Sequence, residues 1–124
     1  DIVIMAENNK AGFEIVKRLG NKGVKVKHTF GHSGDGKDKE LARKQKMSFF
    51  IGSEQVKATT IHSFKGWEST CLLVHISKAS SATDFAAIYT ALTRLKASEY
   101  GYDSYLTVVC SAPELAEYGK TWNV

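Results

Sequence analysis

Apolar residues along the 124-residue chain fall into short runs that alternate between strand-like and helix-like spacing. A continuous apolar run at residues 2–6 predicts a strand that is covered on both faces. The apolar run at residues 71–76 predicts a second buried strand, and residues 105–110 are expected to form the last strand. A strand-like run at residues 56–61 predicts a further strand. Residues 24–30 alternate between apolar and polar side chains, which predicts a half-exposed or edge strand.

Segments with helical periodicity lie between these runs. The first helix is expected from about residue 11 to residue 19, with Asn8 or Asn9 as its N-cap and Gly20 at its end. Asp84 is expected as the N-cap or a first-turn acid of a later helix, and Pro113 in the first turn of the last one. The remaining helices are expected at residues 37–50, 85–96 and 114–122. Alternation of strands and helices predicts one α/β domain, residues 1–124, with three layers and a mostly parallel sheet.

Composition narrows the class of protein only slightly. Hydrophobic residues make up 43% and charged residues 24%, as in ordinary globular domains. The net charge of +4 is compatible with a phosphate-bearing partner but does not require one. No apolar run approaches the roughly 20 residues that span a bilayer, and there is no signal peptide, so we expect a cytoplasmic protein without membrane contact. Cys71 and Cys110 lie in apolar runs and are expected to be buried, reduced thiols.

A cluster of polar residues interrupts two apolar strands at residues 60–68, TIHSFKGWE. Lys65 and Gly66 suit close approach to a phosphate, through charge and bare backbone respectively, and Glu68 can accept hydrogen bonds from sugar hydroxyls. The alternative is an ordinary connection with solvated polar side chains. Three further side chains can donate hydrogen bonds to nucleic-acid phosphates, namely Thr60, His62 and Ser63.

A second segment, residues 87–96, has a helical apolar face and ends in two cations, Arg94 and Lys96. Cations in the last turn of a helix interact favourably with its dipole, which is the structural interpretation. The functional interpretation is an arginine presented across an interface to stabilise charge on a transferring phosphoryl group.

Together these two segments resemble a known pair of motifs. Residues 60–68 (TIHSFKGWE) and 89–96 (YTALTRLK) are similar to motifs V and VI of UvrD/Rep-like superfamily 1 DNA helicases, which read roughly T-[IL]-H-x-x-K-G-L-E and Y-V-A-L-T-R-A-K. Their order and separation match, and the flanking strands fit the second RecA-like motor domain of that family. The chain departs from the family at Trp67 (usually leucine), at Leu95 (usually alanine) and in a longer loop at residues 97–104.

The resemblance implies a role for each matching residue. Arg94 would be the catalytic arginine that reaches the γ-phosphate of ATP bound on the first motor domain. Lys65, Gly66 and Glu68 would lie near the nucleotide's phosphates and ribose. The residues that would contact single-stranded DNA are Thr60, His62 and Ser63.

The resemblance also implies a larger protein with two motor domains. The full protein would hydrolyse ATP with Mg²⁺ in the cleft between two RecA-like domains and step along single-stranded DNA, with the N-terminal RecA-like domain as the partner of this chain. The chain starts abruptly on a strand, so we expect a fragment of a longer protein, without the large insertion that many relatives carry before motif V. Because it has no credible Walker A or Walker B motif, the isolated chain is expected to have no significant ATPase activity.

Two rival interpretations stay open. The chain could be a non-catalytic nucleic-acid-binding module that keeps the RecA-like fold. It could also be a small nucleotide-binding enzyme that uses residues 31–37 (GHSGDGK), which fit the start of a P-loop. Asp38 argues against the nucleotide-binding enzyme. A P-loop has a serine or threonine at this position, whose hydroxyl binds magnesium, whereas Asp38 would place a carboxylate beside the phosphates.

Three other features carry less weight. The cations of residues 37–46 form either a solvated helix face or a phosphate-tracking patch. Trp67 and Trp122 are expected to be packing residues, and Phe64 is a possible core residue. No metal site is expected. The spacing of His28, His32 and His75 from one another and from the two cysteines is not that of metal ligands.

Overall fold

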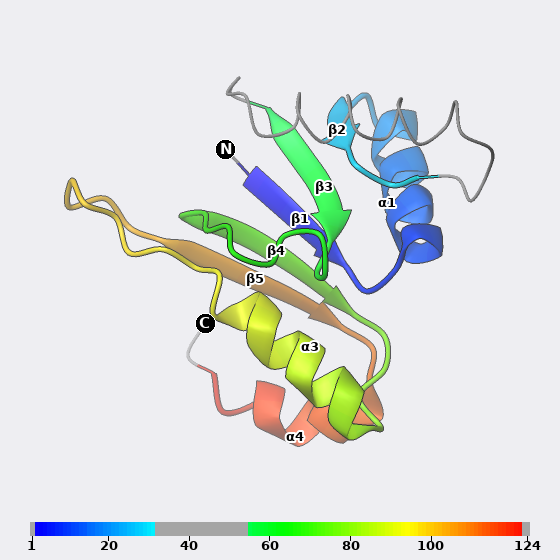
Figure 1. Ribbon diagram of the computed structural model, residues 1–124, viewed down its shortest axis with the longest axis vertical. Helices are drawn as coiled ribbons and strands as arrows, with labels where there is room; N and C mark the ends of the chain where they lie inside the picture. The colour runs from blue at the N-terminus through cyan, green and yellow to red at the C-terminus, as the bar shows by residue number, and fades with distance from the viewer. Residues whose placement is uncertain (1, 32–54, 123–124) are drawn as a thin grey trace.

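The computed structural model describes residues 2–31 and 55–122, and within them a five-stranded sheet in which every strand pair is parallel. The strand order is β2-β3-β1-β4-β5 (Figure 1). This confirms the α/β fold and the parallel sheet. The strands are β1 (Ile2–Ala6), β2 (Val26–His28), β3 (Val56–Thr60), β4 (Cys71–Ile76) and β5 (Tyr105–Cys110).

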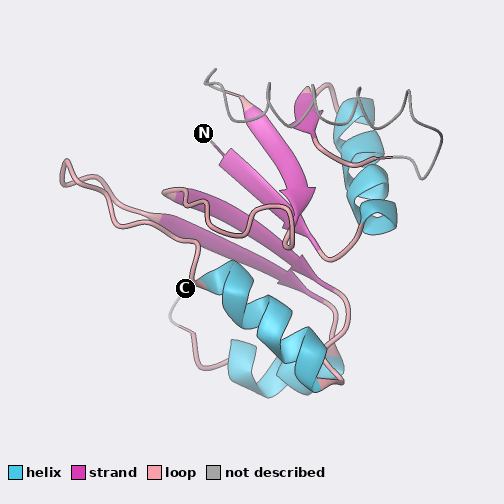
Figure 2. Cartoon of the chain, in the orientation of Figure 1, coloured by secondary structure: helices cyan, strands magenta, loops and turns pink. Residues whose placement is uncertain are grey.

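Helices lie on both faces of the sheet and make three layers (Figure 2). Alternate residues of β1 point to opposite faces, as strand geometry requires. Ile4 and Ala6 pack under α1, whereas Val3 and Met5 pack under α3. The helical elements are α1 (Asn9–Asn21), α3 (Ala82–Leu92), the 3₁₀ turn η1 (Pro113–Leu115) and α4 (Ala116–Gly119).

The start of the chain follows the sequence expectations closely. Asn8 is the N-cap of α1, and its side-chain oxygen accepts a hydrogen bond from the Ala11 amide at 2.9 Å. Strand β2 is shorter than residues 24–30, because only residues 26–28 pair with β3. The helix expected at residues 37–50, its cations and the P-loop-like segment from residue 32 onward lie outside the described residues.

Three expectations for the second half are wrong. α3 spans Ala82–Leu92, so its last turn holds no cation, and Arg94 lies in the turn after the helix. The final segment forms η1 and α4 instead of one helix over residues 114–122, although Pro113 does open it. Cys71 is half-buried and Cys110 is exposed, since β5 is an edge strand.

No helix in the described parts of the chain is long and apolar enough to cross a membrane.

The packing of α1 against the sheet depends on a glycine. Gly12 is buried on the inner face of α1, and a Cβ there would overlap the ring of Phe30, which is 2% exposed. Gly20, near the end of the same helix, has no neighbouring atom within 4 Å of such a Cβ.

We therefore expect opposite effects from the same substitution at these two positions. Gly12→Ala should lower the free energy of unfolding by about 1–3 kcal/mol through overpacking against Phe30. Gly20→Ala should leave it unchanged or raise it by up to about 1 kcal/mol, because alanine is the better helix former. Urea unfolding followed by circular dichroism measures both, and equal effects at the two sites would contradict this account of α1.

Candidate functional site

The candidate site is organised by the β3–β4 loop, residues 61–70. β1 lies between β3 and β4 in the sheet, and all three strands run the same way. The loop therefore starts at the carboxyl edge of the sheet and ends at the amino edge. Thr60 is opposite Ala6 and Leu72 is opposite Val3. These levels differ by three residues of β1, or about 10 Å along the strand.

Phe64 anchors the β3–β4 loop to the body of the domain. Its side chain is 3% exposed and belongs to the same cluster as Ile88 and Ala91 of α3. The loop thus crosses the sheet on the α3 face. The possible core position of Phe64 is confirmed. Trp67, three residues later, is 48% exposed and so packs less fully than expected.

At the carboxyl edge, the predicted DNA-contacting residues form one compact group. The Thr60 hydroxyl donates to Ser63 Oγ at 3.0 Å and accepts from the Ser63 amide at 3.2 Å. This local hydrogen bonding holds the first turn of the β3–β4 loop. His62 lies between them with its side chain exposed. The carboxyl edge is where open α/β sheets usually bind ligands.

Further along the loop, Gly66 adopts a φ of +88°, a conformation that residues with a Cβ rarely take. The turn itself therefore requires glycine at this position, independently of any ligand. Lys65 and Glu68 on either side of it are exposed to solvent. Both retain the accessibility that phosphate or sugar binding needs.

The end of the loop pairs with the segment after α3. Ser69 and Leu95 form a parallel bridge, in which the Ser69 amide donates to the Arg94 carbonyl at 3.0 Å and the Lys96 amide donates to the Ser69 carbonyl at 2.9 Å. The Leu95 side chain packs against the α3-side core. The two sequence segments that resemble motifs V and VI are thus joined by backbone hydrogen bonds.

The Arg94 guanidinium is only partly satisfied by the described residues. Its Nη2 donates to Thr93 Oγ1 at 3.3 Å. Its Nε is buried and has no hydrogen-bond partner within residues 2–31 and 55–122. A buried N–H of a cation without an acceptor is costly. An incoming anion such as a phosphate would remove that cost.

Lys96 forms an ion pair with Glu99. Its Nζ lies 2.8 Å from Glu99 Oε1, and this hydrogen bond and charge pair raise the pKa of Lys96, with a smaller contribution from Glu68. The same pair lowers the pKa of Glu99. Both side chains are largely exposed, so solvent weakens the pair.

The predicted site residues therefore form two groups. Thr60, His62 and Ser63 lie at the carboxyl edge of the sheet. Glu68 and Arg94 lie next to the Ser69–Leu95 bridge, toward the amino edge. One continuous loop connects the groups, and Lys65 and Gly66 lie between them.

Sequence reasoning missed two residues that shape the site. Ser69 forms the bridge, and nothing in its type distinguishes it from an ordinary loop serine. Glu7, directly after β1, accepts hydrogen bonds from the amides of Ser77 at 2.8 Å and Lys78 at 3.1 Å and from the Ser77 hydroxyl. It ties the carboxyl ends of β1 and β4 together across 70 residues. The sequence did offer one signal for Glu7, because it is an acidic residue directly after a strand predicted to be buried.

The donor set fits one half of a nucleotide site. In such a site Arg94 would supply a cation for phosphate, and Glu68 would supply a carboxylate acceptor for sugar hydroxyls. No group of three or more metal-ligating side chains occurs in the part of the chain that the structure describes. Any Mg²⁺ that accompanies a nucleotide would therefore need ligands beyond these residues.

No family model, curated protein or solved structure matches this chain.

The anchoring role of Phe64 gives a stability prediction. Phe64→Ala should lower the free energy of unfolding by about 3–5 kcal/mol, because it empties a buried site under α3. Trp67→Ala removes a larger side chain from the same loop, but a half-exposed one, and should cost less than half as much. Chemical denaturation of both variants makes the comparison, and a larger loss at Trp67 would refute the anchor.

The start of α3 gives a pH prediction. Ser81 and Asp84 form a capping box, and hydrogen bonds to the Asp84 carboxylate, first from the Ser80 amide and then from Ser81, lower the pKa of Asp84. A lowered folded-state pKa stabilises the fold above the unfolded pKa of about 3.9, and this stability is lost as pH falls through the folded-state value.

Asp84→Asn should therefore be less stable than the parent chain at pH 7, and the difference should shrink below about pH 4. Thermal unfolding between neutral and acidic pH measures this difference. A gap that stays constant over the whole range would exclude the carboxylate as its source.

Proposed function

We propose that this chain is the second RecA-like motor domain of an ATP-dependent superfamily 1 DNA helicase. The observation that carries the proposal is the Ser69–Leu95 bridge, which joins the two motif-like segments and pairs the backbone of Arg94 with that of Ser69. The three-layer parallel α/β fold is compatible with a RecA-like domain. The full protein would be cytoplasmic, with the first RecA-like domain and single-stranded DNA as partners.

In this proposal Arg94 acts on ATP held by the first motor domain. Its guanidinium has a buried N–H without an acceptor among the described residues, and a phosphate oxygen would be a suitable acceptor for it. Placed against the γ-phosphate, it would stabilise the charge that develops during phosphoryl transfer. ATP bound with Mg²⁺ supplies the phosphoryl group. Lys65 and Gly66 approach phosphate in the same proposal, and Glu68 accepts from the ribose.

The β3–β4 loop would couple the nucleotide to DNA. Thr60, His62 and Ser63 form one hydrogen-bonded group at its start, and Glu68 lies at its other end. Because Phe64 joins the middle of the loop to the close-packed core under α3, strain at either end of the loop would be carried through that core. This arrangement supports a link between ATP hydrolysis and movement along single-stranded DNA.

The alternative is a nucleic-acid-binding module without motor activity. The exposed His62 and Lys65 and the net charge of +4 would serve that function equally well. The two proposals differ at Arg94, which a simple binding module would not need for catalysis.

The proposal predicts a selective loss of hydrolysis. In the full-length protein, Arg94→Ala should reduce the DNA-stimulated kcat for ATP by about 10³-fold or more while leaving ATP binding nearly unchanged. Arg18→Ala, which removes an exposed arginine from α1, is the control and should have no effect. Steady-state hydrolysis and equilibrium nucleotide binding are measured side by side.

An unchanged kcat for Arg94→Ala would refute the role of this arginine. Turnover by the isolated chain that survives loss of Arg94 but not of Lys37 would instead support the small nucleotide-binding enzyme.

A further inference from the structure

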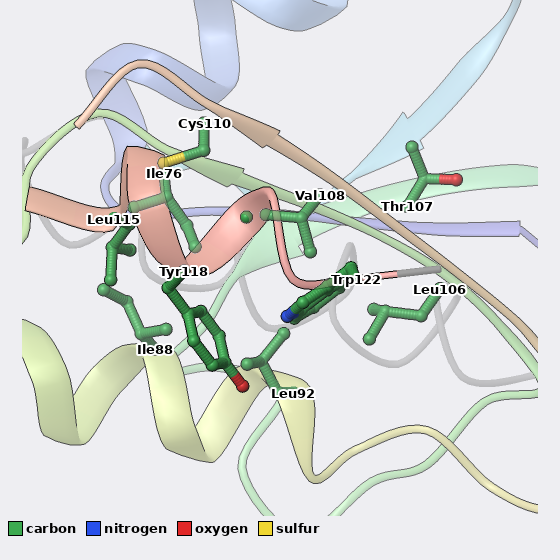
Figure 3. A pocket seen from close by; sticks show the side chains of 11 residues that line it. Ile76, Ile88, Leu92, Leu106, Thr107, Val108, Cys110, Leu115, Tyr118 and Trp122 are labelled. Carbon is green, nitrogen blue, oxygen red and sulfur yellow. The ribbon is translucent and has the colours of Figure 1, made fainter. Parts of the chain in front are cut away.

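A concave site lies on the α3 face of the sheet, and no residue of the β3–β4 loop lines it. It is a pocket of about 400 Å³ between α3, β5 and the C-terminal segment, and we name it the α3–β5 pocket (Figure 3). None of the residues assigned above to nucleotide or DNA lines it, so its function does not depend on the proposed helicase activity. Its main walls are Ile88, Leu92, Leu106, Val108, Tyr118 and Trp122.

The lining determines the charge of any occupant. Most of the lining side chains are aliphatic or aromatic, and the polar groups among them are the Thr107 hydroxyl, the Tyr118 phenol, the Trp122 indole and the Cys110 thiol. No lysine, arginine, aspartate or glutamate of the described residues contributes to it. A charged molecule would lose its hydration here without gaining a partner, so the occupant is uncharged.

The two aromatic walls determine its shape. The Tyr118 and Trp122 rings meet edge to face, with centroids 5.8 Å apart and planes at 80°. Figure 3 shows both rings lying between α3 and β5. Such a pair offers both a ring face and a ring edge, which favours contact with another aromatic ring.

The volume of the α3–β5 pocket fits a small molecule better than a whole partner helix. A helix in a groove is about 10–12 Å wide and buries side chains over several turns. A single pocket of about 400 Å³ falls instead in the size range of small-molecule sites, roughly 300–1,000 Å³.

From this charge, shape and volume we propose that the α3–β5 pocket binds an uncharged, largely apolar aromatic molecule of bicyclic size. Its rings would lie against Tyr118 and Trp122, and its apolar edges against Leu106 and Val108. Hydrogen bonding would be limited to the hydroxyl, phenol, indole and thiol of the lining residues.

The test uses 2-naphthol as the probe and the full 124-residue chain labelled with ¹⁵N. The chain has two tryptophans, and only Trp122 lines the pocket, so the two indole N–H signals report on different sites. Saturable shifts at Trp122 and β5, with a dissociation constant below about 1 mM and no shift at Trp67, are expected.

Matched variants on one strand locate the binding site. Val108 packs toward the α3-side core and lines the pocket, whereas Val109 is 48% exposed and does not. Val108→Phe fills the pocket and should weaken binding about tenfold or more, and Val109→Phe should leave it unchanged. If Val108→Phe is unfolded, Trp122→Ala, which removes an aromatic wall near the chain end, serves in its place with the same expected loss.

A charged analogue tests the other half of the inference. 2-Naphthoate has the same ring system with a carboxylate, and it should bind at least several-fold more weakly than 2-naphthol. The proposal is overturned by the absence of saturable shifts, by equal shifts at Trp67 and Trp122, by equal losses at Val108 and Val109, or by equal affinity for the two naphthalene compounds.

Discussion

The position of β1 between β3 and β4 is the constraint on which the candidate site depends. Because all three strands are parallel, the chain that leaves β3 must pass β1 and travel the length of the sheet before it can enter β4. No helix makes this crossing. A loop of ten residues makes it, so the polar groups of the loop are spread from one edge of the sheet to the other.

Such a loop needs fixed points, and the structure provides three. Hydrogen bonds between Thr60 and Ser63 fold its first turn. Phe64 is buried under α3. Ser69 pairs with the chain around Leu95. The last contact exists because α3 runs back from the carboxyl edge to the amino edge and ends at Leu92. The turn after it then reaches the end of the loop, and Arg94 is placed as a consequence.

The fold was largely predictable because its signals are local. Apolar runs, helical spacing and caps such as Asn8 depend on neighbouring residues, and the predicted strands and the first helix follow them. The failures occur where packing overrides local pattern. α3 ends two residues before Arg94, since the Ser69–Leu95 bridge competes for those backbone groups. Cys110 lies in an apolar run, yet the sheet ends at β5 and leaves that thiol exposed.

The sequence by itself determined the strands, the parallel α/β class and the identity of the polar residues at positions 60–68 and 94. These follow from hydrophobic spacing and residue chemistry, which are readable one segment at a time. Only the tertiary structure decided how those polar residues are distributed. Strand order separates Thr60 from Glu68 by the length of the sheet, and backbone pairing brings Ser69 to Arg94. Both are long-range contacts, and no local pattern encodes which segments meet.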